Sequence, residues 1–390
     1  AIIHWQDFSI QQNEITRFNQ QSASSAVLNR VVGGNTSQIL GSLQSNGRVF
    51  LVNPNGIVFG QGATVDVAGL VATSLNLSDA DFLAGRHRFN NDPNAQAVSN
   101  AGHLTAQQGG EIWLIAPNVE NSGVINAPNG EILLAAGASV ELVNSRDPNL
   151  RVNITAPAGD ATNVGQLVAG AGRLGLFGTL VKNSGQVSAD SATLQGGKIV
   201  FRSSQRTEIT GTASATGQGG GEIKVLSDMQ TGTVSVSGTL DASAPTSGDG
   251  GFIDTSAAHV QIRNGARIST LAANGNNGNW LIDPTDYTIA ATDPLNGSSW
   301  MSGATLGSAL NGGNVTIQTL ATGAGNGDIF VNDAVTWSSQ NTLTLNAHRN
   351  IEINAAITSG VPGVSNPGHL SARADLSGTG SGTVIFGAGG

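Results

Sequence analysis

The side chains that could carry catalysis are few and scattered along this 390-residue chain. Its 26 acidic residues include two close pairs, Asp79/Asp81 and Asp283/Asp286, in polar stretches where aspartate commonly caps turns. Carboxylates grouped on one face of a β-sheet stack would support polysaccharide cleavage, but the sequence shows no such group. Motifs for a serine nucleophile, a zinc hydrolase and a phosphate-binding loop are absent as well. We therefore expect no catalytic residues and no enzyme, and we keep a polysaccharide lyase or hydrolase as the alternative.

Metal and cofactor sites are not indicated either. The chain has no cysteine, which excludes disulfides, thiol nucleophiles and thiolate ligands. Its six histidines are far apart in the sequence, so a zinc site would need them to meet across distant segments. We expect no metal and no cofactor. Trp113 and Trp280 lie in strand-like stretches and are expected in the core, whereas Trp300 lies in a polar insertion and is our candidate for an exposed ligand contact, such as stacking on a sugar.

Composition favours one elongated repeat structure over several ordinary domains. The chain has 54 glycines, 39% apolar residues, 11% charged residues and 4% aromatic residues. This is too apolar for a disordered chain and too poor in charge for a helical protein. The net charge of −9 and the lack of basic clusters argue against nucleic acid and anionic membranes as partners. No apolar run is long enough to span a bilayer, and we expect a monomer.

A glycine-led repeat organises most of the chain. Each copy has a glycine, a polar residue and then alternating apolar residues, and a second mark of the form Asn-x-Gly recurs out of phase at Asn100, Asn121 and Asn183. The glycines that open the copies are Gly110, Gly130, Gly172, Gly197, Gly221, Gly251, Gly278, Gly313 and Gly327. Units of roughly 20–30 residues without helices are typical of a parallel β-helix. The alternative, a large β-sandwich, would show hairpins at closer spacing.

Three stretches interrupt or close the repeat. The long gap after Gly130 predicts a projecting hairpin near residues 140–154, and a similar excursion is expected over residues 78–92. A polar insertion near residues 291–312 is expected to hold a short helix over residues 302–310. The bulky residues Trp5, Phe8 and Phe18 gather at the N-terminal end, where a repeat stack needs a cover for its open edge. Because the chain opens in a strand pattern and ends in mid-pattern, we expect a removed export signal and a longer native protein.

A compact turn lies among the first repeats. Residues 53–56 read Asn-Pro-Asn-Gly and connect two strand-like stretches, residues 48–52 and 57–59. The first Asn can cap a type I turn, Pro presets the backbone at the second position and Gly closes the turn. Local chemistry alone predicts a corner between two buried strands.

The surrounding segments resemble a known family over about residues 1–200. The matching pieces are Asn29-Arg30-Val31, Gln38-Ile39-Leu40-Gly41, Asn46-Gly47, Phe50-Leu51, Asn53-Pro54-Asn55-Gly56-Ile57 and Leu70-Val71-Ala72-Thr73-Ser74-Leu75. Their order resembles the two-partner secretion (TPS) domain, which opens filamentous haemagglutinin and the high-molecular-weight adhesins of Gram-negative bacteria. Downstream, residues 278–284 resemble a segment of large exoproteins of this type.

This resemblance implies an all-β fold, a right-handed parallel β-helix with an N-terminal cap and extra-helical β-hairpins. Residues 1–230 would form the secretion domain, and residues 231–390 would continue the repeats. The domain would be read by the periplasmic POTRA modules of an outer-membrane TpsB-type transporter. The residues that the family pattern ties to secretion are Asn53, Pro54, Asn55, Gly56, Ile57, Asn29 and Arg30.

The resemblance also implies a class of function. The whole protein would be a secreted or surface adhesin of a Gram-negative bacterium, acting in cell adhesion, aggregation, biofilm formation or virulence by binding a host receptor or matrix polysaccharide. The alternative within the same class is a carrier of haem-acquisition or contact-dependent toxin activity on the same scaffold.

Overall fold

A computed structural model of the chain describes all residues except 143–151, 157–158, 194, 295–296, 322–324 and 361–366. The chain forms two compact units. Unit 1 comprises residues 1–189 and 197–202, and unit 2 comprises residues 190–196 and 203–390. Each unit consists of short parallel strands paired from coil to coil, so the parallel β-helix that the glycine-led repeat predicts is confirmed. Among the described residues, no helix has the length and apolar character needed to cross a membrane.

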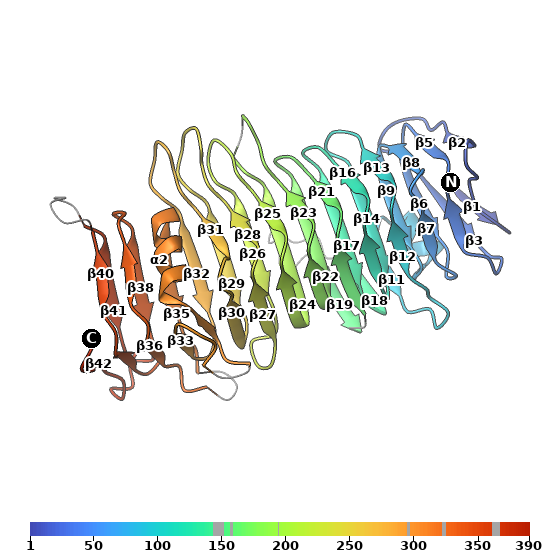
Figure 1. Ribbon diagram of the computed structural model, residues 1–390. Helices are drawn as coiled ribbons and strands as arrows, with labels where there is room; N and C mark the ends of the chain where they lie inside the picture. Colours follow the sequence, from blue (N-terminus) through green and yellow to red (C-terminus); the bar gives the residue numbers. More distant parts are fainter. Residues whose placement is uncertain (143–151, 157–158, 194, 295–296, 322–324, 361–366) are drawn as a thin grey trace. The chain divides into compact units, whose positions relative to one another are not determined.

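Unit 1 stacks its strands in three columns, drawn in blue to green in Figure 1. The first column contains β1 (Ile2–Trp5), β3 (Ala26–Val31), β6 (Arg48–Val52), β9 (Gly69–Thr73), β14 (Glu111–Ala116), β17 (Glu131–Ala136) and β22 (Arg173–Asn183). The second contains β4 (Ser37–Ile39), β7 (Ile57–Phe59), β12 (Val98–Asn100), β15 (Val119–Asn121) and β20 (Asp160–Asn163), followed by the end of β22. The third contains β2 (Ile15–Phe18), β5 (Ser42–Ser45), β8 (Thr64–Val67), β13 (His103–Ala106), β16 (Val124–Asn126), β21 (Gln166–Val168) and β23 (Gln186–Ser188).

Buried asparagines join successive coils of unit 1 at one corner. The side-chain Nδ2 of Asn100 donates to Oδ1 of Asn121, Asn121 donates to Asn163, and Asn163 donates to Asn183, each over 2.8 Å. All four side chains are at most 1% exposed. A buried amide is costly unless both of its polar ends are satisfied, and this ladder satisfies them. The Asn-x-Gly marks of the sequence therefore correspond to an inter-coil asparagine ladder.

Stacked glycines occupy the corner that precedes the first column. A Cβ atom on Gly130 would lie 2.0 Å from the carbonyl oxygen of Gly110, and one on Gly172 would lie 2.2 Å from the carbonyl oxygen of Gly130. The backbones of neighbouring coils thus approach more closely than any side chain permits. In unit 2 a Cβ on Gly278 would meet the Gly251 carbonyl oxygen at 1.9 Å. The leading glycine is required by this approach at these coils, whereas a Cβ on Gly313 or Gly327 would meet the side chain of Thr270 or His348.

Four strands of the first column in unit 1, β6, β9, β14 and β17, are buried on both faces. Their inward side chains, such as Val49 and Leu51, fill the coil interior, whereas outward side chains such as Phe50, Val71 and Trp113 form a second apolar cluster. That cluster is covered by an antiparallel sheet outside the coils, made of β10 (Asn76–Leu77), β11 (Arg88–Asn90), β18 (Ser139–Leu142) and β19 (Val152–Ala156), together with α1 (Asp79–Leu83).

The extra-helical hairpins and the N-terminal cap of the expected fold are confirmed. Strands β18 and β19 pair antiparallel, and so do β10 and β11; the turn expected between β18 and β19 lies outside the described residues. At the N-terminus, Trp5 and Phe8 meet edge to face at 5.3 Å and Phe8 stacks with Phe18 at 6.3 Å. These rings cover the first coil.

Unit 2 continues the same three-column arrangement. Its first column contains β26 (Glu222–Leu226), β29 (Phe252–Ser256), β32 (Asn279–Asp283), β35 (Asn314–Gln318), β38 (Thr342–Asn346) and β41 (His369–Arg373). Its second contains the end of β24 (Lys198–Ile209), β27 (Thr233–Val236), β30 (His259–Ile262), β34 (Trp300–Met301), β33 (Tyr287–Ile289), β36 (Ile329–Val331), β39 (Ile351–Ile353) and β42 (Val384–Phe386). The remaining strands are β25 (Thr212–Ser214), β28 (Thr239–Asp241), β31 (Arg267–Ser269), β37 (Val335–Trp337) and β40 (Ile357–Ser359).

Helix α2 (Gly303–Gly312) lies in the polar insertion, close to the helix expected over residues 302–310. It contacts β31 and β37, and Figure 1 shows it in orange among the strands of unit 2. Ser302 caps its N-terminus by accepting from the Thr305 backbone N–H. A Cβ on Gly303 or on Gly307 would lie within 2.2 Å of a backbone oxygen before or in β37. Two glycines one turn apart therefore let the helix lie against the strand.

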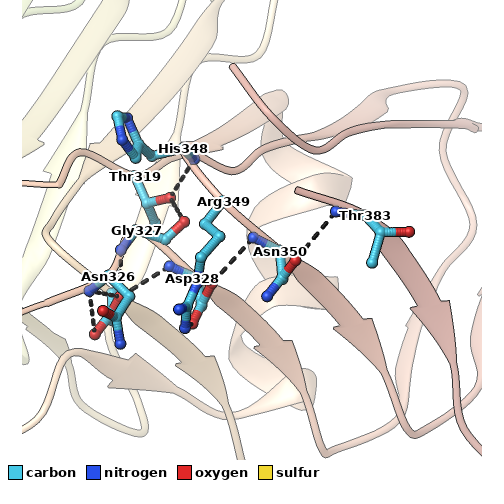
Figure 2. A network of polar contacts seen from close by, with 9 residues as sticks. Thr319, Asn326, Gly327, Asp328, His348, Arg349, Asn350 and Thr383 are labelled. Atoms are coloured by element: carbon cyan, nitrogen blue, oxygen red, sulfur yellow. Dashed lines mark hydrogen bonds and ion pairs between the residues drawn. The ribbon is translucent and has the colours of Figure 1, made fainter. Parts of the chain in front are cut away.

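The last coils of unit 2 are joined by hydrogen bonds to carboxylate and amide side chains (Figure 2). These side chains lie just before the strands of the second column. Oδ1 of Asp286 accepts from the backbone N–H groups of residues 326–328. Asp328 in turn accepts from the Asn350 N–H and from Arg349, and Asn350 accepts from the Thr383 N–H over 3.1 Å. The bonds from Arg349 are the largest cause that lowers the pKa of Asp328. Each coil thus offers a side-chain acceptor to the next coil.

Replacing Gly130 by alanine tests the glycine stack. Because Cβ has no rotamer that avoids the Gly110 carbonyl oxygen, we expect Gly130→Ala to lower the free energy of unfolding by about 3 kcal/mol. Urea unfolding followed by circular dichroism measures this loss. The matched control is Gly34→Ala, where Cβ would meet no atom within 4 Å. Equal unfolding midpoints for the two variants would contradict the proposed role of the stack.

Candidate functional site

The Asn53–Gly56 turn forms the corner between β6 and β7. The Gly56 backbone N–H donates to the Asn53 carbonyl oxygen over 3.0 Å, which closes the turn. Gly56 has a φ of +93°, a conformation that favours glycine. Both flanking strands run parallel to their neighbours in the stack, so the turn is a corner of a coil and not a hairpin.

The Asn53 side chain joins this corner to the preceding coil. Its Nδ2 donates to the Asn35 carbonyl oxygen and to the Ser37 hydroxyl, each over 2.9 Å. Its Oδ1 accepts from the backbone N–H of Asn55 over 3.0 Å. Asn55 then donates through Nδ2 to the Gly33 carbonyl oxygen over 2.9 Å. Both asparagines therefore use their amides to connect the turn with residues 33–37.

The backbone of the turn is bonded to the following coils as well. The Asn53 N–H donates to the Thr73 carbonyl oxygen over 3.0 Å, and the Pro54 carbonyl oxygen accepts from the Gln96 N–H over 2.9 Å. Ile57 N–H donates to the Ala97 carbonyl oxygen over 3.2 Å. The turn is thus enclosed between an earlier and a later part of the stack.

Enclosure buries most of the residues that the family pattern ties to secretion. Asn53 and Ile57 are 0% exposed and Gly56 is buried, whereas Pro54 and Asn55 are half-buried. A rigid partner that docks on the folded unit cannot contact the Asn53 side chain. The local turn chemistry that the sequence predicts is present, but its polar groups face the protein and not the solvent.

Asn29 and Arg30 lie on β3 and face opposite sides. Asn29 is 0% exposed; its Oδ1 accepts from Trp5 Nε1 over 3.0 Å and its Nδ2 donates to the Phe50 carbonyl oxygen over 3.3 Å. Arg30 points outward and donates to the Leu77 carbonyl oxygen and to Asp79. Asn29 therefore fixes the cap, and Arg30 fixes the extra-helical sheet and α1 to the coil. Neither side chain contacts the turn in the described contacts.

Sequence reasoning missed the residues that hold the turn. Asn35, Ser37 and Thr36 come from the corner of the preceding coil, where Thr36 Oγ1 donates to the Asn55 carbonyl oxygen over 2.8 Å. The only signal for them in the sequence is a short polar run before an apolar strand. Such runs are common, and the coil register that brings this one to Asn53 cannot be read from it.

Trp300 is not an exposed ligand contact, and that expectation is wrong. The residue belongs to β34, which pairs with both β30 and β33, and its side chain is 4% exposed. The Arg263 guanidinium lies 5.8 Å from the ring centroid. The polar residues around Trp300 suggested a surface insertion, but two residues of that insertion enter the sheet and carry the indole into the interior.

The two aspartate pairs do not form a catalytic arrangement. Asp79 and Asp81 lie in the first turn of α1, where Asp79 pairs with Arg30 and Asp81 pairs with Arg86, each at 2.7 Å. These bonds are typical of helix-start residues. Asp286 accepts three backbone N–H groups, as described above. Asp79, Asp81 and Asp286 therefore act in ion pairing and in accepting backbone N–H groups.

Asp283 is the carboxylate with the most perturbed proton affinity. It ends β32, it is half-buried, and its Oδ1 has no hydrogen-bond partner among the described residues. Burial is the larger cause and the neighbouring Asp254 carboxylate the smaller one, and together they raise its pKa to about 7. Burial also raises the pKa of Asp254, which accepts a hydrogen bond from Ser256. Burial on a sheet face, with like-charged neighbours as the smaller cause, explains these two raised pKa values without a catalytic role.

Histidines do not converge in the described part of the chain. His4, His103 and His369 are exposed, whereas His87, His259 and His348 are half-buried. Within the described residues, no group of three or more His, Asp or Glu side chains could hold a metal ion.

Comparison with known proteins gives three kinds of likeness. The family model of the TPS secretion domain matches residues 1–225. A "Heme/hemopexin-binding protein" of Haemophilus influenzae (strain ATCC 51907 / DSM 11121 / KW20 / Rd) is 52% identical over 75 residues, which cover 19% of this chain and 8% of that protein. A second protein of the same name from Haemophilus influenzae is 43% identical over 89 residues, covering 23% of this chain and 10% of that protein.

The fold is also similar to a solved structure. The HMW1 secretion domain from Haemophilus influenzae aligns with a TM-score of 0.66 at 24% identity, covering 99% of this chain and 92% of that one. This likeness concerns the fold alone. The curated relatives are much longer proteins, since this chain matches only 8% and 10% of their lengths.

The raised pKa of Asp283 predicts a pH dependence of stability. Because the folded state holds this proton more tightly than the unfolded chain, the contribution of Asp283 to the free energy of unfolding is highest at low pH. It falls as the pH rises from about 4 towards 7. Asp283→Asn does not titrate, so we expect it to be about 1–2 kcal/mol more stable than the parent at pH 8 and equal to it near pH 4, after allowing for solvent screening. Urea unfolding at the two pH values measures the difference. The exposed Asp66 provides the control variant Asp66→Asn, and a pH-independent gain in Asp283→Asn would refute the linkage.

Proposed function

Because the chain belongs to the TPS secretion domain family, we propose that it is the secretion domain of a larger exoprotein. Its partner is a TpsB-type outer-membrane transporter, whose periplasmic POTRA modules bind the chain and whose barrel exports it. The domain is a non-enzymatic export domain, and the mature protein is secreted or held at the cell surface of a Gram-negative bacterium. The family match over residues 1–225 supports this assignment.

Burial of the Asn53–Gly56 turn carries the mechanism that we propose. Asn53, Gly56, Ile57 and Asn29 are buried once the coils have formed. The transporter can therefore read these residues only while the chain is unfolded. Recognition belongs to the unfolded chain in the periplasm, and folding follows after passage.

Folding then removes the recognised form from the equilibrium. Folding consumes the unfolded chain after passage. By mass action, this draws more unfolded chain through the transporter. Once Asn53 is bonded to Asn35 and Ser37, the motif is no longer available for the transporter to rebind. The same hydrogen bonds that close the turn thus make export favour one direction.

The folded coils also template those that follow. Each coil presents paired strands and corner acceptors to the next coil, and the first coil bears the ordering entropy without a neighbour. The cap residues Trp5 and Phe8 and the tight turn lower this nucleation cost. Residues 1–230 are proposed as the secretion domain proper, and residues 231–390 as repeats that add to it.

The activity of the whole exoprotein has two candidates. The two relatives named as heme/hemopexin-binding proteins favour a role in haem acquisition. Adhesion to a host receptor or matrix polysaccharide is the candidate that the sequence resemblance implied. Pull-down of hemopexin by the full-length exoprotein distinguishes them: capture supports the haem role, and adhesion to cells without capture supports the adhesin role.

Secretion of two asparagine variants tests whether the motif is recognised. Asn53→Ala and Asn121→Ala each remove a buried amide, 0% exposed, with several hydrogen bonds. Each leaves buried partners unsatisfied, so we expect both to lower the free energy of unfolding by about 2–4 kcal/mol. If the transporter reads Asn53 in the unfolded chain, Asn53→Ala reduces the secreted amount at least fivefold more than Asn121→Ala.

The measurement compares secreted and periplasmic protein in a strain that carries the cognate transporter. Unfolding of the purified variants supplies the stability loss of each. Equal secretion defects at equal stability loss would show that the turn matters only for folding, and the recognition step would then be wrong.

A further inference from the structure

A cleft of about 590 Å³ opens on unit 1, and the repeat itself builds most of it. Three successive coils contribute the same three repeat positions, two corner residues and the first residue of the strand. These residues are Gly109, Gly110 and Glu111 at β14, Asn129, Gly130 and Glu131 at β17, and Ala171, Gly172 and Arg173 at β22. Arg48, His87 and Trp113 complete the lining.

Four charged side chains form a row along the cleft. Strand register places Glu111 opposite Glu131 and Glu131 opposite Arg173. Arg48, two coils before Glu111, pairs with it across Gly69. A Cβ on Gly69 would lie 2.9 Å from Glu111 Oε1, so the glycine gives the carboxylate space to reach Arg48. Arg48 and Arg173 are the positive ends of the row, and Glu111 and Glu131 are the two negative groups between them. The formal charges of the four side chains cancel.

Trp113 supplies an unsatisfied donor beside this row. Its side chain is 3% exposed, and its Nε1 has no hydrogen-bond partner among the described residues. The His87 ring meets it edge to face at 4.9 Å. Buried donors without partners are rare in folded proteins, and each calls for an explanation such as a bound group.

The chemistry of the cleft excludes several ligands. An anion would meet Glu111 and Glu131, and a cation would meet Arg48 and Arg173. A peptide cannot add as a strand, because β14 and β17 are paired on both sides. It would also find little apolar surface, since the glycines offer no side chain and Trp113 is already buried.

We propose that this cleft binds a neutral, hydroxyl-rich ligand, a short oligosaccharide. Sugar hydroxyls both donate and accept, so they suit a row that has guanidinium donors at its two ends and two carboxylate acceptors between them. Bare glycine backbone lets a ring approach closely. A volume of about 590 Å³ lies in the range of sites that hold small ligands. The assignment is independent of export, because it concerns the folded unit.

Binding of defined glycans to the full 390-residue chain tests the proposal. The probe is a glycan array with neutral, sulfated and sialylated oligosaccharides, followed by titration calorimetry with the strongest neutral hit. We expect a neutral hit, and we expect Glu131→Gln and Gly109→Asn each to weaken it at least tenfold. Asparagine is chosen at position 109 because Asn129 holds the same repeat position with a φ of +52°. It narrows the cleft, and asparagine tolerates the left-handed φ of +77° at this position better than most side chains.

The matched control is Glu222→Gln. Glu222 starts β26 after Gly221, the same repeat position as Glu131, but it lies outside the cleft. This variant is expected to bind as the parent does, and circular dichroism melting checks that all variants fold. The proposal is overturned if no neutral glycan binds, if only charged glycans bind, or if either cleft variant retains the parent affinity.

Discussion

The polar contacts at the corners of the coils determine how every other part of the chain is placed. Between corners the coils meet through backbone ladders and apolar side chains. A shift of two residues would keep the pairing pattern and the buried face, so these contacts specify the register weakly where the side chains are alike. An amide that bonds to the amide of the next coil is directional. Asn121 must lie opposite both Asn100 and Asn163, because breaking a buried hydrogen bond costs about 1–3 kcal/mol. The register set at the corner is then kept along the strands, and the turn at Asn53 obeys the same constraint.

The two units use their outward faces differently. In unit 1 the outward residues of β6, β9, β14 and β17 that follow the first position of each strand are apolar and lie under the extra-helical sheet. In unit 2 the matching positions carry polar residues such as Lys224, Asp254 and Thr316 on half-buried faces. The sequence of a strand that is covered on both faces is a continuous apolar run. In a strand that is covered on one face, apolar and polar residues alternate. The cleft, the buried motif and the capped end all belong to the doubly covered unit.

Much of the fold could be predicted from the sequence because its signals are local and repeated. Three local patterns each predict one feature of a stack. A glycine before each strand predicts a close approach of coils, an asparagine before a glycine predicts a corner, and bulky rings at one end predict a cap. The hydrogen-bond partners of Asn53 could not be predicted, because they depend on which coil lies beside it and the loops vary in length. Trp300 was placed wrongly because its surroundings are polar while its strand pairing is not local. The Arg48–Glu111 pair joins residues 63 apart across a glycine, and no pattern in the sequence marks it.

The extra-helical sheet also determines the order in which parts of unit 1 become buried during folding. It draws β10 and β11 from residues 76–90, and β18 and β19 from residues 139–156. In a chain that emerges from its N-terminus, Phe82 and His87 are available early to cover Phe50. Val140 on β18 joins the outward cluster only when the later pair of strands has arrived. The early coils are therefore covered in two stages, and the second stage is slow because it closes contacts that are distant in sequence.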